Sequence, residues 1–84
     1  MMSCQQHDYL EIACLYNLPI KLYLKSGATY KGAAIDTRWN ANREECMVIS
    51  VENEQISIAL DAICKMEALT KNRHFDVITF DQTI

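Results

Sequence analysis

The sequence lacks several features that define common protein classes. It has no uninterrupted apolar run of about 18 residues, the length needed to cross a membrane. Residues 1–17 contain no lysine or arginine, so the basic start of a secretory signal peptide is missing. Its 84 residues, 50% of them hydrophobic, suffice for one compact core but not for two. We therefore expect a single cytoplasmic domain over residues 1–84, with no membrane partner.

Metal-binding and catalytic motifs are also missing. The four cysteines form no C-x-x-C pair, and neither His7 nor His74 lies at ligand spacing from a cysteine or from the other histidine. The even number of cysteines leaves disulfides open, although reduced thiols are the expected state in a cytoplasmic chain. No nucleophile, base and orienting acid form a recognisable set. We expect no metal, no cofactor and no enzymatic activity.

Positive charge is scarce at the start of the chain. The sequence has 11 acidic and 8 basic residues and a net charge of −3, so its overall field does not attract nucleic acid. Residues 1–17 contain Asp8 and Glu11 without any lysine or arginine. The N-terminal segment is therefore locally anionic.

The same segment has the spacing of an amphipathic helix. An apolar stripe is formed by Leu10, Ala13, Cys14 and Leu18. Asn17 tolerates the left-handed conformation that ends helices, and Pro19 cannot continue one. We expect residues 1–18 to form a helical arm whose stripe packs on the rest of the fold.

Residues 19–84 have the alternation of β-strands. Ile20 to Leu24 alternate apolar and polar side chains, and Ser26-Gly27 supplies a turn. The second strand is expected to end at Asp36, which would fix the following turn through backbone hydrogen bonds. Gly32 lies inside that strand and predicts a sharp bend, a bulge or a close backbone approach.

The second half of the chain continues this pattern. Residues 38–45 are polar without alternation and predict a loop, and strands are expected at 47–51 and 55–60. Residues 65–69 fit a strand or a turn of helix, and residues 75–80 fit a last strand at a sheet edge. The prediction is a mainly β fold with a short N-terminal helix.

This order of elements resembles the Sm-like fold, and three motifs narrow the resemblance. They are Cys4-x-x-x-Asp8-x-Leu10-Glu11-x-Ala13-Cys14, Leu22-x-Leu24-Lys25-x-Gly27 and Leu60-Asp61-x-Ile63. In order and spacing they resemble the Rof family, the Rho-binding antiterminators of bacteria. The resemblance implies a strongly bent, five- to six-stranded antiparallel barrel in residues 19–84.

The resemblance also implies a function and a binding surface. Members of this family inhibit Rho-dependent transcription termination by occupying the primary RNA-binding site on the N-terminal domain of Rho and keeping RNA out. The family's contact surface, at the helix start and on the polar loop, corresponds here to His7, Asp8, Tyr9, Glu11, Asn40, Asn42 and Arg43. We expect a monomer that does not itself bind nucleic acid.

Several of these residues have structural explanations that the sequence leaves open. Asp8 and Glu11 have the spacing of a capping box at a helix start. Tyr9 could pack on the barrel, and Trp39 could either anchor the polar loop or face a partner. Contact residues and structural residues are therefore not separated by the sequence.

The main alternative is an Sm-like protein that forms a ring and binds RNA itself. Asp36 and Asn40 have the spacing of the Asp and Asn in the first Sm signature. The Arg-Gly of the second signature is missing, because Asp61-Ala62 precedes Ile63. A ring former would elute as a hexamer or heptamer and bind RNA, whereas the inhibitor would elute small and ignore RNA.

Overall fold

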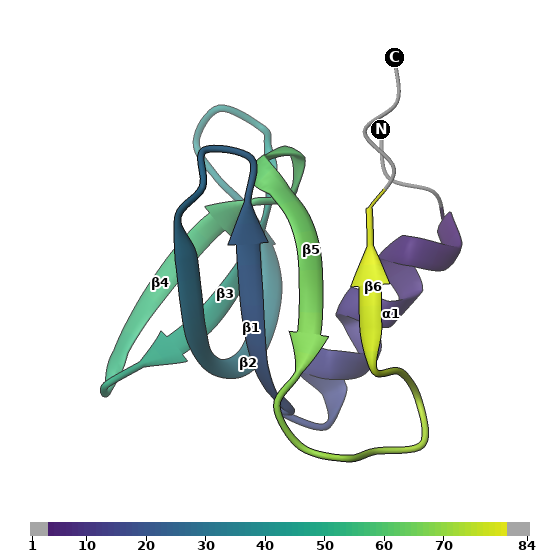
Figure 1. Ribbon diagram of the computed structural model, residues 1–84. Coiled ribbons are helices and arrows are strands. Elements are labelled where there is room, and N and C mark those ends of the chain that lie inside the picture. Colours follow the sequence, from purple (N-terminus) through teal and green to yellow (C-terminus); the bar gives the residue numbers. More distant parts are fainter. Residues whose placement is uncertain (1–3, 81–84) are drawn as a thin grey trace.

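The computed structural model describes residues 4–80, which form one helix and a six-stranded antiparallel sheet (Figure 1). The helix α1 spans Cys4–Leu15. The strands are β1 (Pro19–Leu24), β2 (Thr29–Trp39), β3 (Glu45–Val51), β4 (Glu54–Ala59), β5 (Ile63–Ala68) and β6 (Val77–Thr79), and a 3-10 turn, η1 (Leu60–Ala62), joins β4 to β5. Within the described residues no helix reaches the length and hydrophobicity that a membrane crossing requires.

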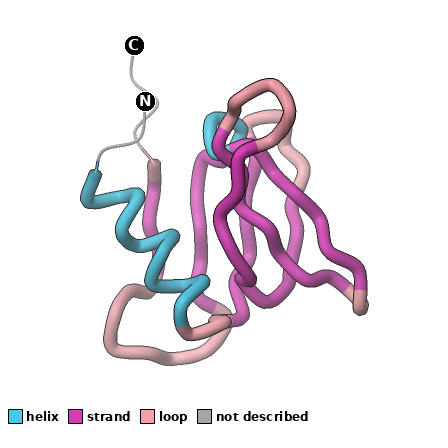
Figure 2. Tube along the Cα trace, turned by 180° about the vertical axis from the view of Figure 1, so that it is seen from behind, coloured by secondary structure: helices cyan, strands magenta, loops and turns pink. Residues whose placement is uncertain are grey.

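The sheet has the strand order β4-β3-β2-β1-β5-β6, with β4 and β6 at its edges. It bends strongly, and α1 packs against β2 and lies beside β6 in both views of the chain (Figures 1 and 2). The Gln6 side chain donates a hydrogen bond from Nε2 to the Thr79 carbonyl oxygen at 3.1 Å. The predicted mainly β fold with an N-terminal helix and a bent antiparallel sheet is confirmed. The predicted domain limits at residues 1 and 84 lie outside the described residues.

The core cluster joins buried side chains of the sheet with those of α1, and α1 contributes the side predicted from its spacing. Leu10 and Ala13 are fully buried, and Cys14 and Leu18 are partly buried against the same cluster. Asn17 ends the helix with a φ of 49° and donates a hydrogen bond from Nδ2 to the Ala34 carbonyl oxygen at 2.9 Å. This side-chain bond attaches the end of α1 to β2.

The bend in β2 has two causes. At Gly32, an added Cβ would lie 2.2 Å from the Ser50 carbonyl oxygen, so only glycine permits this close approach of β2 to β3. Further along, the register between β2 and β3 shifts between Ala34 and Asp36, which marks a β-bulge. The predicted close approach is confirmed.

Asp36 does not end its strand, contrary to the prediction. The ladder with β3 continues through Arg38 and Trp39, so Asp36 lies at the bulge inside β2. Its Oδ1 accepts a hydrogen bond from the Thr37 amide at 2.8 Å. The carboxylate therefore supports the irregular backbone of the bulge instead of a turn.

Several further boundaries differ from the prediction. The helix already includes Cys4, so Asp8 lies in its interior and the capping-box interpretation is wrong. The predicted loop over residues 38–45 is shorter, because Arg38 and Trp39 still pair with β3. The last strand covers only Val77–Thr79 of the predicted residues 75–80.

Candidate partner-binding surface

The exposed side of α1 is acidic. Asp8 and Glu11 are three positions apart, so they lie on the same side of the helix, and both are exposed. The sequence of α1, CQQHDYLEIACL, contains no lysine or arginine. Among residues 4–80, the Asp8 carboxylate makes no hydrogen bond or ion pair. We call Asp8 and Glu11 the acidic face of α1.

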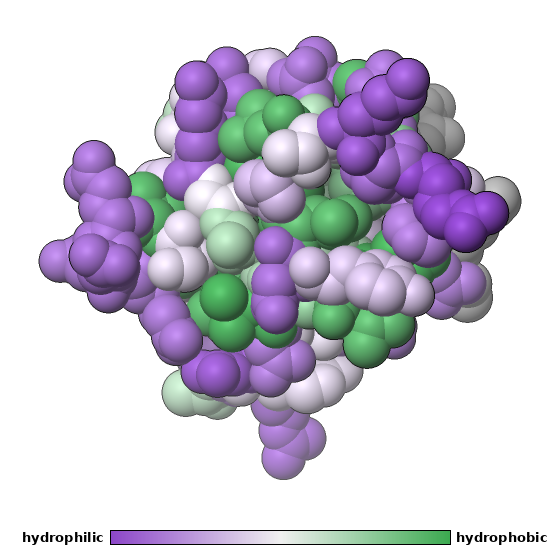
Figure 3. Space-filling view, turned by 90° about the horizontal axis from the view of Figure 1, so that it is seen from below, coloured by the Kyte–Doolittle hydropathy of each residue, from purple (hydrophilic) through white to green (hydrophobic). Residues whose placement is uncertain are grey.

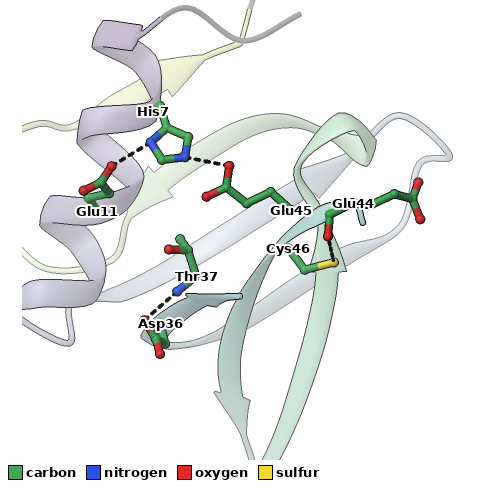
Figure 4. A network of polar contacts seen from close by, with 7 residues as sticks. All are labelled: His7, Glu11, Asp36, Thr37, Glu44, Glu45 and Cys46. Carbon is green, nitrogen blue, oxygen red and sulfur yellow. Dashed lines mark hydrogen bonds and ion pairs between the residues drawn. The ribbon is translucent and has the colours of Figure 1, made fainter. Parts of the chain in front are cut away.

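His7 lies next to this face and bridges two carboxylates (Figure 4). Its Nδ1 is 2.8 Å from Glu11 Oε1 on the same helix, and its Nε2 is 3.0 Å from Glu45 Oε1 on β3. The His7 and Glu45 side chains are 27% and 26% exposed. His7 was predicted as a contact residue, and the structure places both of its ring nitrogens in contacts within the chain.

The two carboxylates change the ionisation of His7. Burial, the largest single influence, lowers the pKa of the imidazole, but the hydrogen bonds and negative charges of Glu45 and Glu11 together outweigh it. The net result is a pKa above the ordinary value of 6.5. A raised pKa means that the bridge stabilises the fold fully below about pH 6.5 and loses this effect as the pH rises through the pKa of the folded protein.

Tyr9 faces the interior side of the helix. Its ring meets Phe75 edge-on, with the ring centroids 6.1 Å apart and the planes at 70°. The residue is only partly exposed and packs against the core cluster. Of the four helix residues predicted to bind a partner, Tyr9 and His7 therefore make structural contacts within the chain.

The loop between β2 and β3 comprises residues 40–44 and is organised by Asn40. The Asn40 Oδ1 accepts hydrogen bonds from the amides of Asn42 at 2.8 Å and Glu44 at 3.0 Å. Its Nδ2 donates to Glu44 Oε1 at 3.2 Å and to Cys46 Sγ at 3.6 Å. The Asn40 side chain thus stabilises the conformation of the loop. We call this segment loop 40–44.

The other predicted loop residues are displayed to solvent. Asn42 and Arg43 are exposed, and Arg43 has a φ of 62°, a left-handed conformation uncommon for a residue other than glycine. Trp39, directly before the loop, pairs with Glu45 in the ladder and is 69% exposed. Of the two interpretations of Trp39, a loop anchor or an exposed aromatic, the structure supports the second.

An open groove of about 720 Å³ is lined by residues of α1 on one side and of β2 on the other. Its lining combines three carboxylates with apolar and small side chains, namely Asp8, Glu11, Asp36, Ile12, Cys14, Leu15, Ile35 and Thr37. Burial, followed by the nearby charges of Asp36 and Glu11, raises the pKa of the Cys14 thiol to about 11. The thiol is protonated at neutral pH and is a poor nucleophile.

The remaining surface includes a smaller cavity of about 450 Å³, lined by residues 68–72, Phe75 and Asp76. Within residues 4–80, no three His, Cys, Asp or Glu side chains gather in a way that could hold a metal ion. Seen from below, hydrophobic side chains form separate areas among hydrophilic ones (Figure 3). Among the described side chains, the large hydrophobic residues with the greatest exposure are Leu15, Trp39 and Tyr16.

The structure joins the two predicted parts of the surface through one contact that the sequence did not reveal. Glu45 follows loop 40–44 and meets His7 of α1, although the two are far apart along the chain. The pairing depends on how α1 packs against the sheet, and no local pattern encodes it. Trp39 was recognisable as the only tryptophan beside a polar segment, but only the structure establishes its exposure.

Comparisons with known proteins agree on one family. Residues 1–80 match the family described as "Modulator of Rho-dependent transcription termination (ROF)". The solved structure of YaeO bound to magnesium, from Vibrio cholerae O395, is similar to this chain, with 45% sequence identity and a TM-score of 0.86. The similarity covers 90% of this chain and 99% of YaeO. A search of curated proteins gave no match.

Proposed function

The chain belongs to the ROF family of modulators of Rho-dependent transcription termination, and from this premise we propose that it is an antiterminator that occupies the primary RNA-binding site of Rho. The protein acts by obstruction and carries out no catalysis. It works in the cytoplasm as a monomer and does not bind RNA itself. The observation that carries the proposal is the acidic face of α1 beside an exposed hairpin loop.

The proposal has a simple electrostatic basis. A groove that accepts single-stranded RNA is basic, to follow the phosphates, and offers aromatic surfaces on which bases stack. A helix that displays carboxylates and has no lysine or arginine is complementary to such a groove and competes with phosphate for the same basic side chains. Asp8 is suited to this role, because its carboxylate is exposed and has no partner among the described residues.

The groove between α1 and β2 extends this complementarity. Lysine and arginine side chains have an apolar stem and a charged end. Ile12, Leu15 and Ile35 offer an apolar lining for the stem, while the carboxylates of Asp8 and Asp36 lie on the same groove for the charged end. The groove therefore fits the long basic side chains expected in an RNA-binding site.

The predicted contact residues divide into two groups in this proposal. Asp8, Glu11, Asn42 and Arg43 are exposed and face the partner directly. His7, Tyr9 and Asn40 hold the surface together through the contacts described above. Trp39 joins the first group, because an exposed tryptophan is among the residues that contribute most to binding when a partner buries them.

The test is a competition experiment with purified Rho and a fluorescently labelled cytosine-rich RNA, followed by anisotropy. We expect the protein to displace the RNA from Rho and to leave the anisotropy of RNA alone unchanged. Displacement should weaken as salt rises, because the contacts between charges are screened. If Rho keeps its RNA, the proposal is wrong. Binding to RNA alone, with elution as a hexamer or heptamer, would instead support the Sm-like ring.

A charge-reversal variant locates the surface. Asp8→Lys removes one exposed carboxylate without touching the His7 bridge, and we expect it to weaken binding to Rho by about tenfold or more. The matched control is Asp61→Lys, which changes the net charge equally at an exposed residue of η1. Circular dichroism must show both variants folded. Equal binding by the two variants would exclude the acidic face as the contact surface.

A further inference from the structure

His7 connects the two parts of the proposed binding surface. It belongs to α1, and its second contact, Glu45, is the first residue of β3, directly after loop 40–44. Figure 4 shows the imidazole between the two carboxylates, with Glu11 on one side and Glu45 on the other. The bridge therefore ties the end of the hairpin loop to the helix.

The two contacts together require a charged imidazole. A neutral imidazole has one N–H and one lone pair, whereas the imidazolium has two N–H groups. With Nδ1 2.8 Å from Glu11 and Nε2 3.0 Å from Glu45, both nitrogens must donate. If the ring lost a proton, one lone pair would face a carboxylate oxygen, and that contact would become repulsive.

We propose that His7 is a positioning residue that, as a cation, holds loop 40–44 in a fixed place beside α1. The inference rests on the proposed function, because a fixed arrangement matters when helix and loop bind Rho together. Loop 40–44 is already ordered within itself by the Asn40 side chain. The His7 bridge connects this ordered loop to the acidic face of α1. Less conformational entropy is then lost when Rho binds the helix and the loop together.

The charges around His7 favour the cation. The facing groups are Glu11 from α1 and Glu45 from β3, and they raise the pKa of the imidazole in spite of its partial burial. The other charged residues on α1, the adjoining part of β2 and loop 40–44 are Asp8, Asp36, Arg38, Arg43 and Glu44. Arg38 and Asp36 pair with each other, with Nε 3.6 Å from Oδ2. The raised pKa thus favours the closed bridge at acid pH, and the bridge opens as the pH rises through the pKa of His7 in the folded protein.

The first part of the test needs only the free protein. The His7 ring and the loop amides of Asn42 and Glu44 are followed by NMR between pH 5 and 9. We expect His7 to titrate above its ordinary value of 6.5 and the amides to shift with the same midpoint. Glu45→Gln should lower this midpoint and remove the shift of the amides. Asp61→Asn, an equal change of charge at η1, should alter neither.

The second part measures binding to Rho by displacement of the labelled RNA, from pH 6 to 8.5. At pH 6 we expect Glu45→Gln to bind about two- to fivefold more weakly than the parent protein. The difference should vanish above the His7 midpoint, where the parent has also lost the bridge. The Asp61→Asn variant should bind Rho as tightly as the parent protein at every pH. Because any effect of pH on Rho itself is the same for all variants, it cancels in this comparison.

The outcomes separate this inference from the proposed function. If the parent displaces RNA but Glu45→Gln binds equally well at every pH, His7 does not position the loop for binding and the inference is wrong. Loop amides that ignore the titration of His7 would overturn it as well. If the parent displaces no RNA at any pH, the proposed function fails, and the role of His7 in binding Rho fails with it.

Discussion

Replacing Gly32 by alanine is the sharpest structural test, because the added atom has no room. The alanine Cβ would lie 2.2 Å from the Ser50 carbonyl oxygen, 2.9 Å from the Ser50 carbonyl carbon and 3.1 Å from Val51 Cγ2. Ordinary contacts of this kind need about 3.5 Å, so β2 and β3 would have to separate by about 1 Å. The nearest obstacle is backbone in a paired strand, which cannot move aside as a side chain would.

The cost follows from this geometry. Overpacking of a close-packed site costs about 1–3 kcal/mol, and an obstacle made of backbone favours the upper end. A chain of this size has a free energy of unfolding of about 4–13 kcal/mol. A loss of about 3 kcal/mol would lower the melting temperature by about 12–24 °C. Gly32→Ala should therefore remove a substantial part of the stability of the fold.

Urea denaturation followed by circular dichroism measures this loss directly. The comparison variant is Gly27→Ala, where the added Cβ meets nothing within 4 Å and only the φ of +97° opposes a side chain. We expect Gly27→Ala to cost about 1–2 kcal/mol, less than Gly32→Ala. The reasoning is refuted if Gly32→Ala unfolds at the same urea concentration as the parent protein, or if it is the milder of the two changes.

Two further predictions concern α1. Leu10→Ala should lower the free energy of unfolding by about 2–5 kcal/mol, because Leu10 is fully buried. Leu15→Ala, at a residue that is 73% exposed, should change it by less than about 0.5 kcal/mol. Equal losses for the two variants in urea denaturation would contradict the packing of the helix. The Cys14 thiol, with its pKa raised to about 11, should react slowly with iodoacetamide at pH 8 and progressively faster up to pH 11 in the folded protein, as mass spectrometry of its peptide would measure. A reaction rate that already reaches its plateau by pH 9 would contradict the raised pKa of Cys14.

Much of the fold could be predicted because it follows local rules. Alternation in residues 20–24 gave β1, the spacing of Leu10 and Ala13 gave the buried side of α1, and Asn17 marked the end of the helix. Gly32 predicted the close approach of β2 and β3. Each of these signals depends on the residue itself or on neighbours within a few positions.

The strand ends were predicted less well, because pairing partners decide them. Arg38 and Trp39 have the polar surroundings of a loop, but they extend β2 because β3 offers Cys46 and Glu45 as ladder partners. In the same way, Asp36 looked like the end of a strand and lies at a bulge inside it. Hydrogen bonds to a distant segment override local preference at such positions.

The sequence by itself determined the class of the fold, the acidity of α1 and the family to which the chain belongs, since all three rest on residue types and on their spacing along the chain. Only the tertiary structure decided which polar residues have partners. It placed His7 between Glu11 and Glu45, turned Tyr9 towards Phe75 and left Asp8 exposed. The physical reason is that contacts across the fold depend on how α1 packs on the sheet. Burial of the apolar side of α1 fixes this packing. The polar residues that are brought together as a result have no pattern of their own in the sequence.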